Sequence, residues 1–224
     1  MVDRREINSG CVVTDLDGTL IRSNSLVLFT RYLLKTLLQN AKYKEAIRLL
    51  SLVLKRKIRL CSHREMKHGI IAIAKKNLEL KDLDIFGSNL KKDINPEVNL
   101  LLDNFHSQGL TILLATAADD FYIPSFISKI KDYNLQYIAT KFSPNLQDYK
   151  ETKGDSKLKR VKDFINKNNL TCKALISDHY DDLSLFINLP GQKFLVNPSD
   201  KTLQKIRSEF PDATFHQQNG IYQW

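Results

Sequence analysis

Two aspartates one residue apart are the side chains of this chain best suited to chemistry. Residues 14–20 read TDLDGTL and follow the apolar run 11–13. Residues two apart on an extended chain project to the same side, so the carboxylates of Asp15 and Asp17 can converge. Two anions that close are tolerated where a divalent cation shares them, and a carboxylate is a competent nucleophile toward phosphorus. The pair therefore indicates metal-assisted phosphoryl transfer, with an ordinary Asp-Gly turn as the alternative.

A threonine follows another apolar run. Residues 110–115 (LTILLA) are typical of a buried strand, and Thr116 comes directly after them. Its hydroxyl can donate to a phosphate oxygen at little entropic cost, because the χ1 angle of threonine is stiff; a helix cap is the alternative. Gly18, Thr19 and Ala117 are predicted to bind the phosphate with it.

A lysine near the start of a later helix could neutralise the reacting groups. Residues 153–157 read KGDSK and open an amphipathic helical pattern. A lysine there can neutralise both the nucleophile and the transferring phosphoryl group, and this effect strengthens in a water-poor site. We assign the role to Lys157, with Lys153 as the alternative. Because the stretch is rich in basic residues, a solvated surface is the competing interpretation.

Carboxylates also follow a second predicted strand. Asp178 comes directly after residues 173–177. Mg²⁺ favours a few carboxylates plus water and substrate oxygens, so Asp178 can join Asp15 and Asp17 as a metal ligand. Asp182 is expected to support the site indirectly, by holding a metal-bound water or Lys157 in place.

The elements that must position these residues alternate along the chain. Strands are expected at 10–15, 110–115, 136–140, 173–177 and 193–197, and helices near 96–108, 121–132, 156–168, 180–188 and 199–208. This alternation predicts an α/β fold, a Rossmann-like three-layer α/β/α core with a mainly parallel sheet. Ligands of such sheets bind beyond the carboxyl ends of the strands, so Asp15, Thr116 and Asp178 should meet at that edge.

Residues 22–93 interrupt the alternation. They show no strand pattern and predict an inserted all-helical cap domain over the strand ends; we call them the cap segment. The core domain then comprises residues 1–21 and 94–224. After Phe210 the sequence has no periodicity, although its aromatic residues could pack on the core.

Composition fits a globular protein with reduced cysteines. Of 224 residues, 42% are hydrophobic and 26% charged, and the three cysteines lie far apart without metal-ligand spacing. The stretch 1–10 lacks the apolar core of a secretory signal, and no apolar run is long enough to cross a bilayer. We expect a cytoplasmic protein, with a peripheral place at the inner face of the membrane as the alternative.

Taken together, these four segments resemble the haloacid dehalogenase (HAD) superfamily of phosphohydrolases in order, placement and residue type. The resemblance implies that Asp15 is the nucleophile and Asp17 the general acid and base, and that the cofactor is Mg²⁺. The other implied roles are phosphate binding by Thr116, clamping by Lys157 and metal binding by Asp178 with Asp182. The form Asp-x-Asp-Gly-Thr is that of the superfamily's phosphatases.

The cap segment looks like the helical C1 cap of the phosphoserine-phosphatase-like branch. Phosphoserine phosphatase itself has a glutamate nine residues after the nucleophile, which reads the substrate amine, whereas this chain has Asn24. It also has Asp181 where asparagine is usual, and phosphoserine is therefore not an expected substrate. The stretch 28–34 (LFTRYLL) resembles phosphatidylglycerophosphatase C, a lipid phosphate phosphatase of the same branch.

Positive charge is concentrated in the cap segment. The net charge is +9, and residues 22–92 hold 17 Lys and Arg against 5 Asp and Glu, which points to an anionic partner or surface. Residues 42–68 combine nine Lys and Arg with an apolar helix face, a pattern typical of binding to anionic membranes. The competing interpretation is that Ile47, Leu50 and Leu54 pack the cap's own core. Nucleic acid is not expected, because no aromatic residues alternate with these charges.

The sequence thus predicts a Mg²⁺-dependent phosphomonoester hydrolase that forms an aspartyl-phosphate and whose basic cap selects a phosphorylated small molecule. A lipid phosphate phosphatase at the membrane surface is the first alternative. A non-catalytic binding module on an anionic surface is the second.

Overall fold

A seven-stranded sheet forms the centre of the computed structural model, which describes residues 10–130, 133 and 135–224. Its strands lie in the order β3-β2-β1-β4-β5-β7-β6. They are β1 (Gly10–Thr14), β2 (Thr111–Asp119), β3 (Gln136–Thr140), β4 (Thr171–Ser177), β5 (Gln192–Val196), β6 (His216–Gln218) and β7 (Ile221–Gln223). The five strands from β3 to β5 pair in parallel, and β7 and β6 continue the sheet antiparallel. The predicted α/β fold with a mainly parallel sheet is confirmed.

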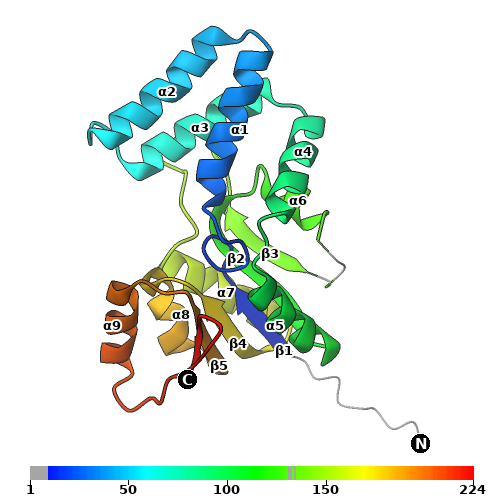
Figure 1. The fold of residues 1–224 in the computed structure, drawn as a ribbon, viewed down its shortest axis with the longest axis vertical. Helices are drawn as coiled ribbons and strands as arrows, with labels where there is room; N and C mark the ends of the chain where they lie inside the picture. Colours follow the sequence, from blue (N-terminus) through cyan, green and yellow to red (C-terminus); the bar gives the residue numbers. More distant parts are fainter. Residues whose placement is uncertain (1–9, 131–132, 134) are drawn as a thin grey trace, which may run out of the picture.

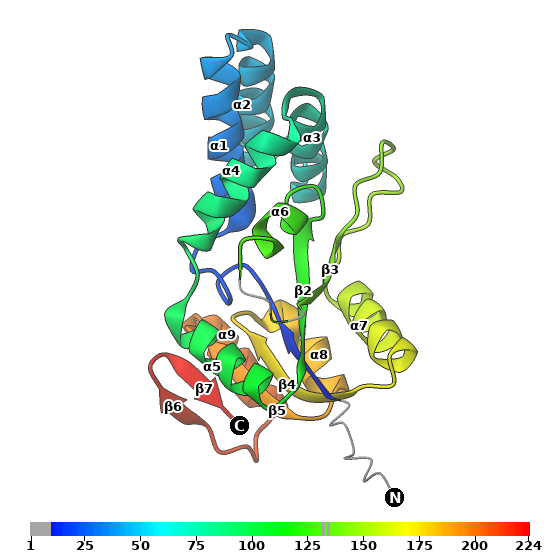
Figure 2. The ribbon, with the colours of Figure 1, turned by 90° about the vertical axis from the view of Figure 1, so that its right-hand side faces the viewer.

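Helices cover both faces of the sheet; Figure 2 shows α5 and α7 on opposite sides. The core helices are α5 (Pro96–Ser107), α6 (Ile123–Ile127), α7 (Asp155–Lys167), the 3₁₀ helix η1 (Tyr180–Asp182), α8 (Leu183–Asn188) and α9 (Asp200–Glu209). Successive strand residues point to opposite faces. Val12 of β1 accordingly packs in the cluster that holds Val98 of α5, whereas its neighbour Val13 packs in the cluster that holds Val161 of α7. The result is the predicted three-layer core.

Three expectations are wrong in detail or fall outside the described residues. Thr116 lies inside β2, which runs on to Asp119 with a shifted register, and does not follow the strand. The helix expected at 121–132 is shorter, since α6 has five residues, and residues 131–132 lie outside the description. The expectation about the N-terminal stretch concerns residues 1–9, which also lie outside it.

The C-terminal tail forms a hairpin that the sequence did not predict. Its strands β6 and β7 have three residues each, and β7 pairs with β5, Tyr222 lying opposite Leu195. The packing of the tail's aromatic residues on the core is confirmed, because the ring of Trp224 contacts those of Phe186 and Phe210. The hairpin therefore extends the sheet beyond β5, and β6 forms its edge.

Four helices make up the cap segment and stand as a group beyond the carboxyl ends of the parallel strands (Figure 1). They are α1 (Ser25–Gln39), α2 (Tyr43–Lys57), α3 (His63–Asn77) and α4 (Leu80–Lys91). Ala46 and Leu49 of α2 are buried, whereas Ile47, Leu50 and Leu54 are 68%, 51% and 57% exposed. The interpretation that these three residues pack the cap's own core is wrong, because the helix packs through its neighbouring side.

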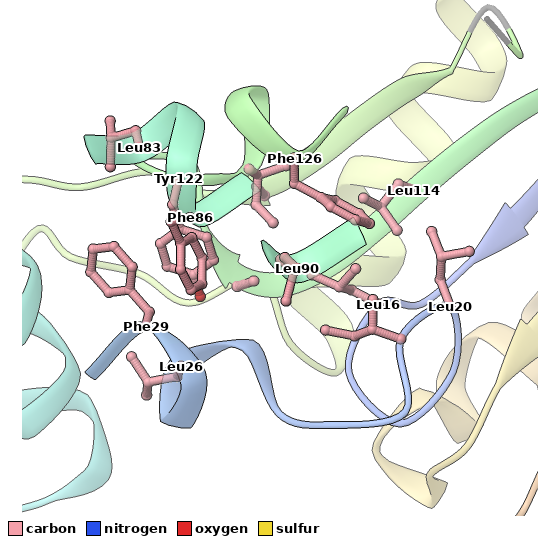
Figure 3. Close-up of a cluster of buried hydrophobic side chains, with 14 of the residues drawn as sticks. Leu16, Leu20, Leu26, Phe29, Leu83, Phe86, Leu90, Leu114, Tyr122 and Phe126 are labelled. Carbon is pink, nitrogen blue, oxygen red and sulfur yellow. The ribbon is translucent and has the colours of Figure 1, made fainter. Parts of the chain in front are cut away.

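An apolar cluster joins the cap segment to the core (Figure 3). The ring of Phe29 in α1 stacks on that of Tyr122, with centroids 4.7 Å apart, and meets the ring of Phe86 in α4 edge-on at 5.0 Å. Gly87 of α4 lies so close to the backbone of Ser125 that a larger residue would collide with it. Helices α1 and α4 are therefore packed on α6 and on Tyr122, which directly precedes it.

Candidate active site

The buried side chains of Lys157 and Asp182 meet the half-buried Asp15 at the carboxyl ends of β1 and β4. Asp15 follows β1, Lys157 lies in the first turn of α7, and Asp182 ends η1. Nζ of Lys157 lies 2.8 Å from Oδ1 of Asp15 and 2.8 Å from each carboxylate oxygen of Asp182. The hydroxyl of Ser177, the last residue of β4, donates to Oδ2 of Asp182 at 2.8 Å. The ammonium group thus has three acceptors, and three of the predicted residues come together.

The opposite charges in this group act against the effect of burial on each pKa. Burial alone would lower the pKa of Lys157, but attraction to Asp15 and Asp182 outweighs burial and raises it. Burial raises the pKa of Asp15, and the nearby ammonium partly offsets that rise. Lys153 is exposed and pairs instead with Asp181 at 2.8 Å. Of the two lysines, Lys157 is the one in contact with the predicted nucleophile.

The first turn of α1 holds the carboxylate of Asp17. The backbone N–H of Ser25 donates to Oδ1 of Asp17 at 2.7 Å, and the side chain of Asn24 caps the helix by accepting from the N–H of Val27 at 3.1 Å. A helix N-terminus stabilises a carboxylate, yet burial outweighs this effect and raises the pKa of Asp17. A carboxyl group with a raised pKa keeps its proton closer to neutral pH, as a general acid requires.

Gly18 brings the two acidic segments against each other. Its φ angle is +75°, a region that favours glycine, and a Cβ at this position would collide with the carboxylate of Asp178. Thr19 is fully buried, and its hydroxyl donates to Oδ1 of Asp178 at 3.4 Å. Burial raises the pKa of Asp178 to about 6. Thr19 therefore orients Asp178, and the contact of Gly18 and Thr19 with phosphate stays a prediction.

Thr116 and Ala117 enter the site from β2. Thr116 is buried, and its Oγ1 accepts from the backbone N–H of Ala118 at 3.0 Å, so the hydroxyl proton can point elsewhere. The carbonyl of Ala117 accepts from the hydroxyl of Thr140 at 2.6 Å and from the ammonium of Lys67. The hydroxyl proton of Thr116 is thus available to another acceptor, and its contact with phosphate stays a prediction.

A cleft of about 280 Å³ opens over these groups. The predicted residues on its walls are Asp15, Asp17, Thr116, Ala117, Lys157, Asp178 and Asp182. The cap segment contributes Asn24 and His63 to the same walls, and the loop after β3 contributes Glu151. The cleft therefore lies between the strand ends and the cap segment.

Lys67 of α3 makes a contact between cap and core that the sequence did not predict. Its Nζ lies 2.8 Å from Oε1 of Glu151, and the side chain is 3% exposed. Lys67 lies on the helix side that also carries the buried Ile70, Ile71 and Ala74, at spacings of three, four and seven residues. A lysine on an otherwise apolar helix side was the signal in the sequence that could have identified it.

The charges of the site suit a divalent cation. Across residues 10–130, 133 and 135–224, no three His, Cys, Asp or Glu side chains lie close enough to hold an ion by themselves. Because the carboxylate of Asp17 faces Ser25, Asp15 and Asp178 are the side chains left to share a cation with water and substrate oxygens. Asp15, Asp17, Asp178 and Asp182 line the same cleft as Lys157 and Lys153. Carboxylates thus outnumber ammonium groups there, and a cation would balance the difference. The all-oxygen donor set fits Mg²⁺, and ligation by Asp17 stays a prediction.

The fold and the site define an α/β enzyme with a centre of buried carboxylates and one lysine. Residues 12–186 match the family model of the haloacid dehalogenase-like hydrolases. Because this match spans most of the chain, the protein belongs to the haloacid dehalogenase-like hydrolase family. No protein of curated function matches the sequence.

Several solved structures share this fold at low sequence identity. A protein of unknown function from Bordetella pertussis Tohama I has a TM-score of 0.68 at 16% identity, over 91% of this chain and 96% of that one. A substrate-bound phosphoserine phosphatase complex has a TM-score of 0.55 at 11% identity, over 88% and 90%. A phospho-aspartyl intermediate analogue of phosphoserine phosphatase has a TM-score of 0.53 at 13% identity, over 88% and 91%. The chain thus shares its fold with phosphoserine phosphatases, as the sequence resemblance implied.

Proposed function

We propose that this hydrolase is a Mg²⁺-dependent phosphomonoesterase that forms a phosphoryl-enzyme on Asp15. The observation that carries the proposal is the triple contact of the buried Lys157, which fixes a positive charge 2.8 Å from Asp15. The similar structure described as a phospho-aspartyl intermediate analogue supports the same chemistry on this fold.

Asp15 and Asp17 act together in both half-reactions. In the first, a carboxylate oxygen of Asp15 attacks phosphorus in line, the bond from phosphorus to the ester oxygen breaks, and Asp17 gives its proton to that oxygen. In the second, Asp17 takes a proton from the water that attacks the acyl-phosphate. Phosphate leaves and the Asp15 carboxylate is restored. The raised pKa of Asp17 suits both steps, because its carboxyl group must first give up a proton and then accept one from water.

Donors of the chain neutralise the charge on the transferring group. Lys157 lies against the nucleophile, and Asp182 holds that ammonium in place. The Thr116 hydroxyl donates to a phosphoryl oxygen. When bound by Asp15 and Asp178, Mg²⁺ supplies further positive charge to the phosphoryl oxygens.

We propose further that residues 22–93 are the cap domain that selects the substrate. Asn24 and His63 place cap side chains in the cleft, and the contact of Lys67 with Glu151 ties the cap to its wall. A cleft of about 280 Å³ is suited to a phosphorylated small molecule or to the head group of a larger one. Phosphate esters of lipids stay the alternative substrates.

The test is hydrolysis of a generic aryl phosphate with and without Mg²⁺. We expect turnover by the wild type with Mg²⁺, and a loss of several orders of magnitude in kcat for Asp15→Asn at unchanged circular dichroism. An acid-quenched reaction with a substrate carrying radioactive phosphate should leave a hydroxylamine-labile label on the wild type and none on Asp15→Asn. Asp200→Asn, at an exposed position of α9, serves as the control with normal activity. Wild-type hydrolysis by Asp15→Asn would remove this residue from the nucleophile role, and an inactive wild type would favour a non-catalytic binding module.

A further inference from the structure

Helix α2 carries an exposed apolar stripe on the side that does not pack against the cap. The stripe consists of Tyr43, Ile47, Leu50, Leu54 and Ile58, and we call it the α2 stripe. Its members follow one another at spacings of four, three, four and four residues, so they share one side of the helix. Each is more than half exposed. The buried side of the same helix is formed by other residues, Ala46 and Leu49.

Such a stripe differs from scattered surface residues. Single exposed apolar side chains are ordinary, but a contiguous apolar patch rimmed by polar residues marks a site of interaction with protein or membrane. The apolar surface continues past the helix end, since Leu60 is also exposed. Because α2 lies at the end of the molecule farthest from the core helices, the core does not cover the patch (Figure 1).

Basic side chains border the α2 stripe. Residues 42–60 contain seven Lys and Arg and a single acidic residue, Glu45. At about 100° per residue, Lys44, Arg48 and Lys55 lie roughly 100° around the helix from the stripe. On this helix, within the part of the chain that the structure describes, the one ion pair joins Arg48 to Glu45 at 4.0 Å. The other basic groups are exposed to solvent and available to an anionic surface.

We propose that the α2 stripe docks the protein on the surface of an anionic lipid bilayer. An amphipathic helix with apolar residues on one side and Lys or Arg beside them lies in the plane of such a surface, its apolar side among the acyl chains and its cations near the head groups. Among the described residues, no helix is long and apolar enough to cross a bilayer, so the contact is peripheral. The proposal concerns a surface separate from the catalytic cleft and does not depend on hydrolysis.

Charge argues against a second copy of the chain on this surface, and the scarcity of aromatic residues argues against single-stranded nucleic acid. A symmetric contact with a second copy would place the seven basic residues of one α2 region against the same seven of the other, and these would repel. Single-stranded nucleic acid is bound by basic grooves with several aromatic stacking residues, whereas residues 42–60 have Tyr43 as their one aromatic side chain. A bilayer satisfies both the aliphatic stripe and its basic border.

Vesicle sedimentation with the full chain tests the proposal. We expect the wild type to bind vesicles of phosphatidylcholine with phosphatidylglycerol at least tenfold more strongly than vesicles of phosphatidylcholine alone, and less strongly as salt is raised. The triple variant Ile47→Ser, Leu50→Ser, Leu54→Ser should lose at least tenfold in binding while remaining folded. A matched control replaces three exposed apolar residues outside the stripe, and its binding should equal that of the wild type. The control substitutions are Leu80→Ser, Ile85→Ser and Leu100→Ser.

Each contrary result has a distinct meaning. Equal binding to neutral and anionic vesicles, or unchanged binding by the stripe variant, would overturn the proposal. A dimer in analytical ultracentrifugation that only the stripe variant loses would assign the surface to a second copy instead. Asp15→Asn should bind vesicles like the wild type, so a failure of docking and a failure of the phosphatase proposal can be told apart.

Discussion

The buried carboxyl group of Asp119 should make the protein less stable as pH rises from about 4 to 6. Burial raises the pKa of Asp119 to about 6 from a model-compound value of 3.8, although Phe121 N–H and Tyr149 O–H donate to it. At about 1.4 kcal/mol for each pH unit, this difference corresponds to about 3 kcal/mol. The folded state binds this proton more tightly than the unfolded state. The contribution of Asp119 to stability is therefore complete below about pH 4 and is lost as pH rises through the folded-state pKa.

The variant Asp119→Asn isolates this contribution. Its amide oxygen can still accept from the Phe121 N–H, and its NH₂ group can donate to the Tyr149 oxygen. Urea unfolding of both proteins at several values between pH 4 and 7 gives the difference in their free energies of unfolding. We expect the variant to gain about 3 kcal/mol relative to the wild type between pH 4 and 7.

A matched control separates burial from the loss of a charge. Asp212→Asn removes a carboxylate that is exposed, and its free-energy difference from the wild type should not change by more than about 0.5 kcal/mol over the same range. The reasoning about Asp119 would be refuted if its variant followed the wild type at every pH, or if both variants shifted alike.

Three further perturbations address the site. Gly18→Ala should lower kcat/KM for an aryl phosphate at least tenfold, because the added methyl group would displace Asp178; wild-type kinetics would contradict the close packing there. Lys157→Met should lower the free energy of unfolding by urea by about 3–5 kcal/mol, because Asp15 and Asp182 lose their ammonium partner. Lys153→Met, which breaks an exposed ion pair, should lower it by less than about 1 kcal/mol. Equal losses would refute the distinction between a buried and an exposed pair. Chelation by EDTA should stop turnover and leave circular dichroism unchanged, and turnover that survives chelation would count against a metal.

The sequence predicted the parallel strands well because each is a short apolar run with a polar or glycine boundary. It did not predict the hairpin of β6 and β7, whose residues HQQ and IYQ are mostly polar and form the sheet edge. Such a strand is stabilised by backbone pairing with β5 and by the packing of Trp224, and neither leaves a periodic pattern.

The site shows the same division between local and tertiary information. Asp15, Lys157 and Asp182 could be assigned together because each lies at a recognisable end of a strand or start of a helix. The packed side of α2 was predicted wrongly, because its apolar residues occupy two neighbouring sides of the helix, and periodicity alone does not say which side faces the other cap helices. The place of Lys67 on an apolar helix side could have been read from the sequence, but its partner Glu151, which is 84 residues away, could not.

The hydrogen bond from Ser25 to Asp17 connects the first helix of the cap segment to the proposed general acid. Ser25 begins α1, and its hydroxyl also lies 3.1 Å from that of Tyr122, so the start of the helix is anchored on both sides. A rotation of α1, caused by a molecule entering the cleft or by a contact made by another cap helix, would change the length of the hydrogen bond from Ser25 to Asp17. The pKa of Asp17 would change with it. In the proposed mechanism, binding of a substrate by the cap segment would therefore change the pKa of Asp17 directly.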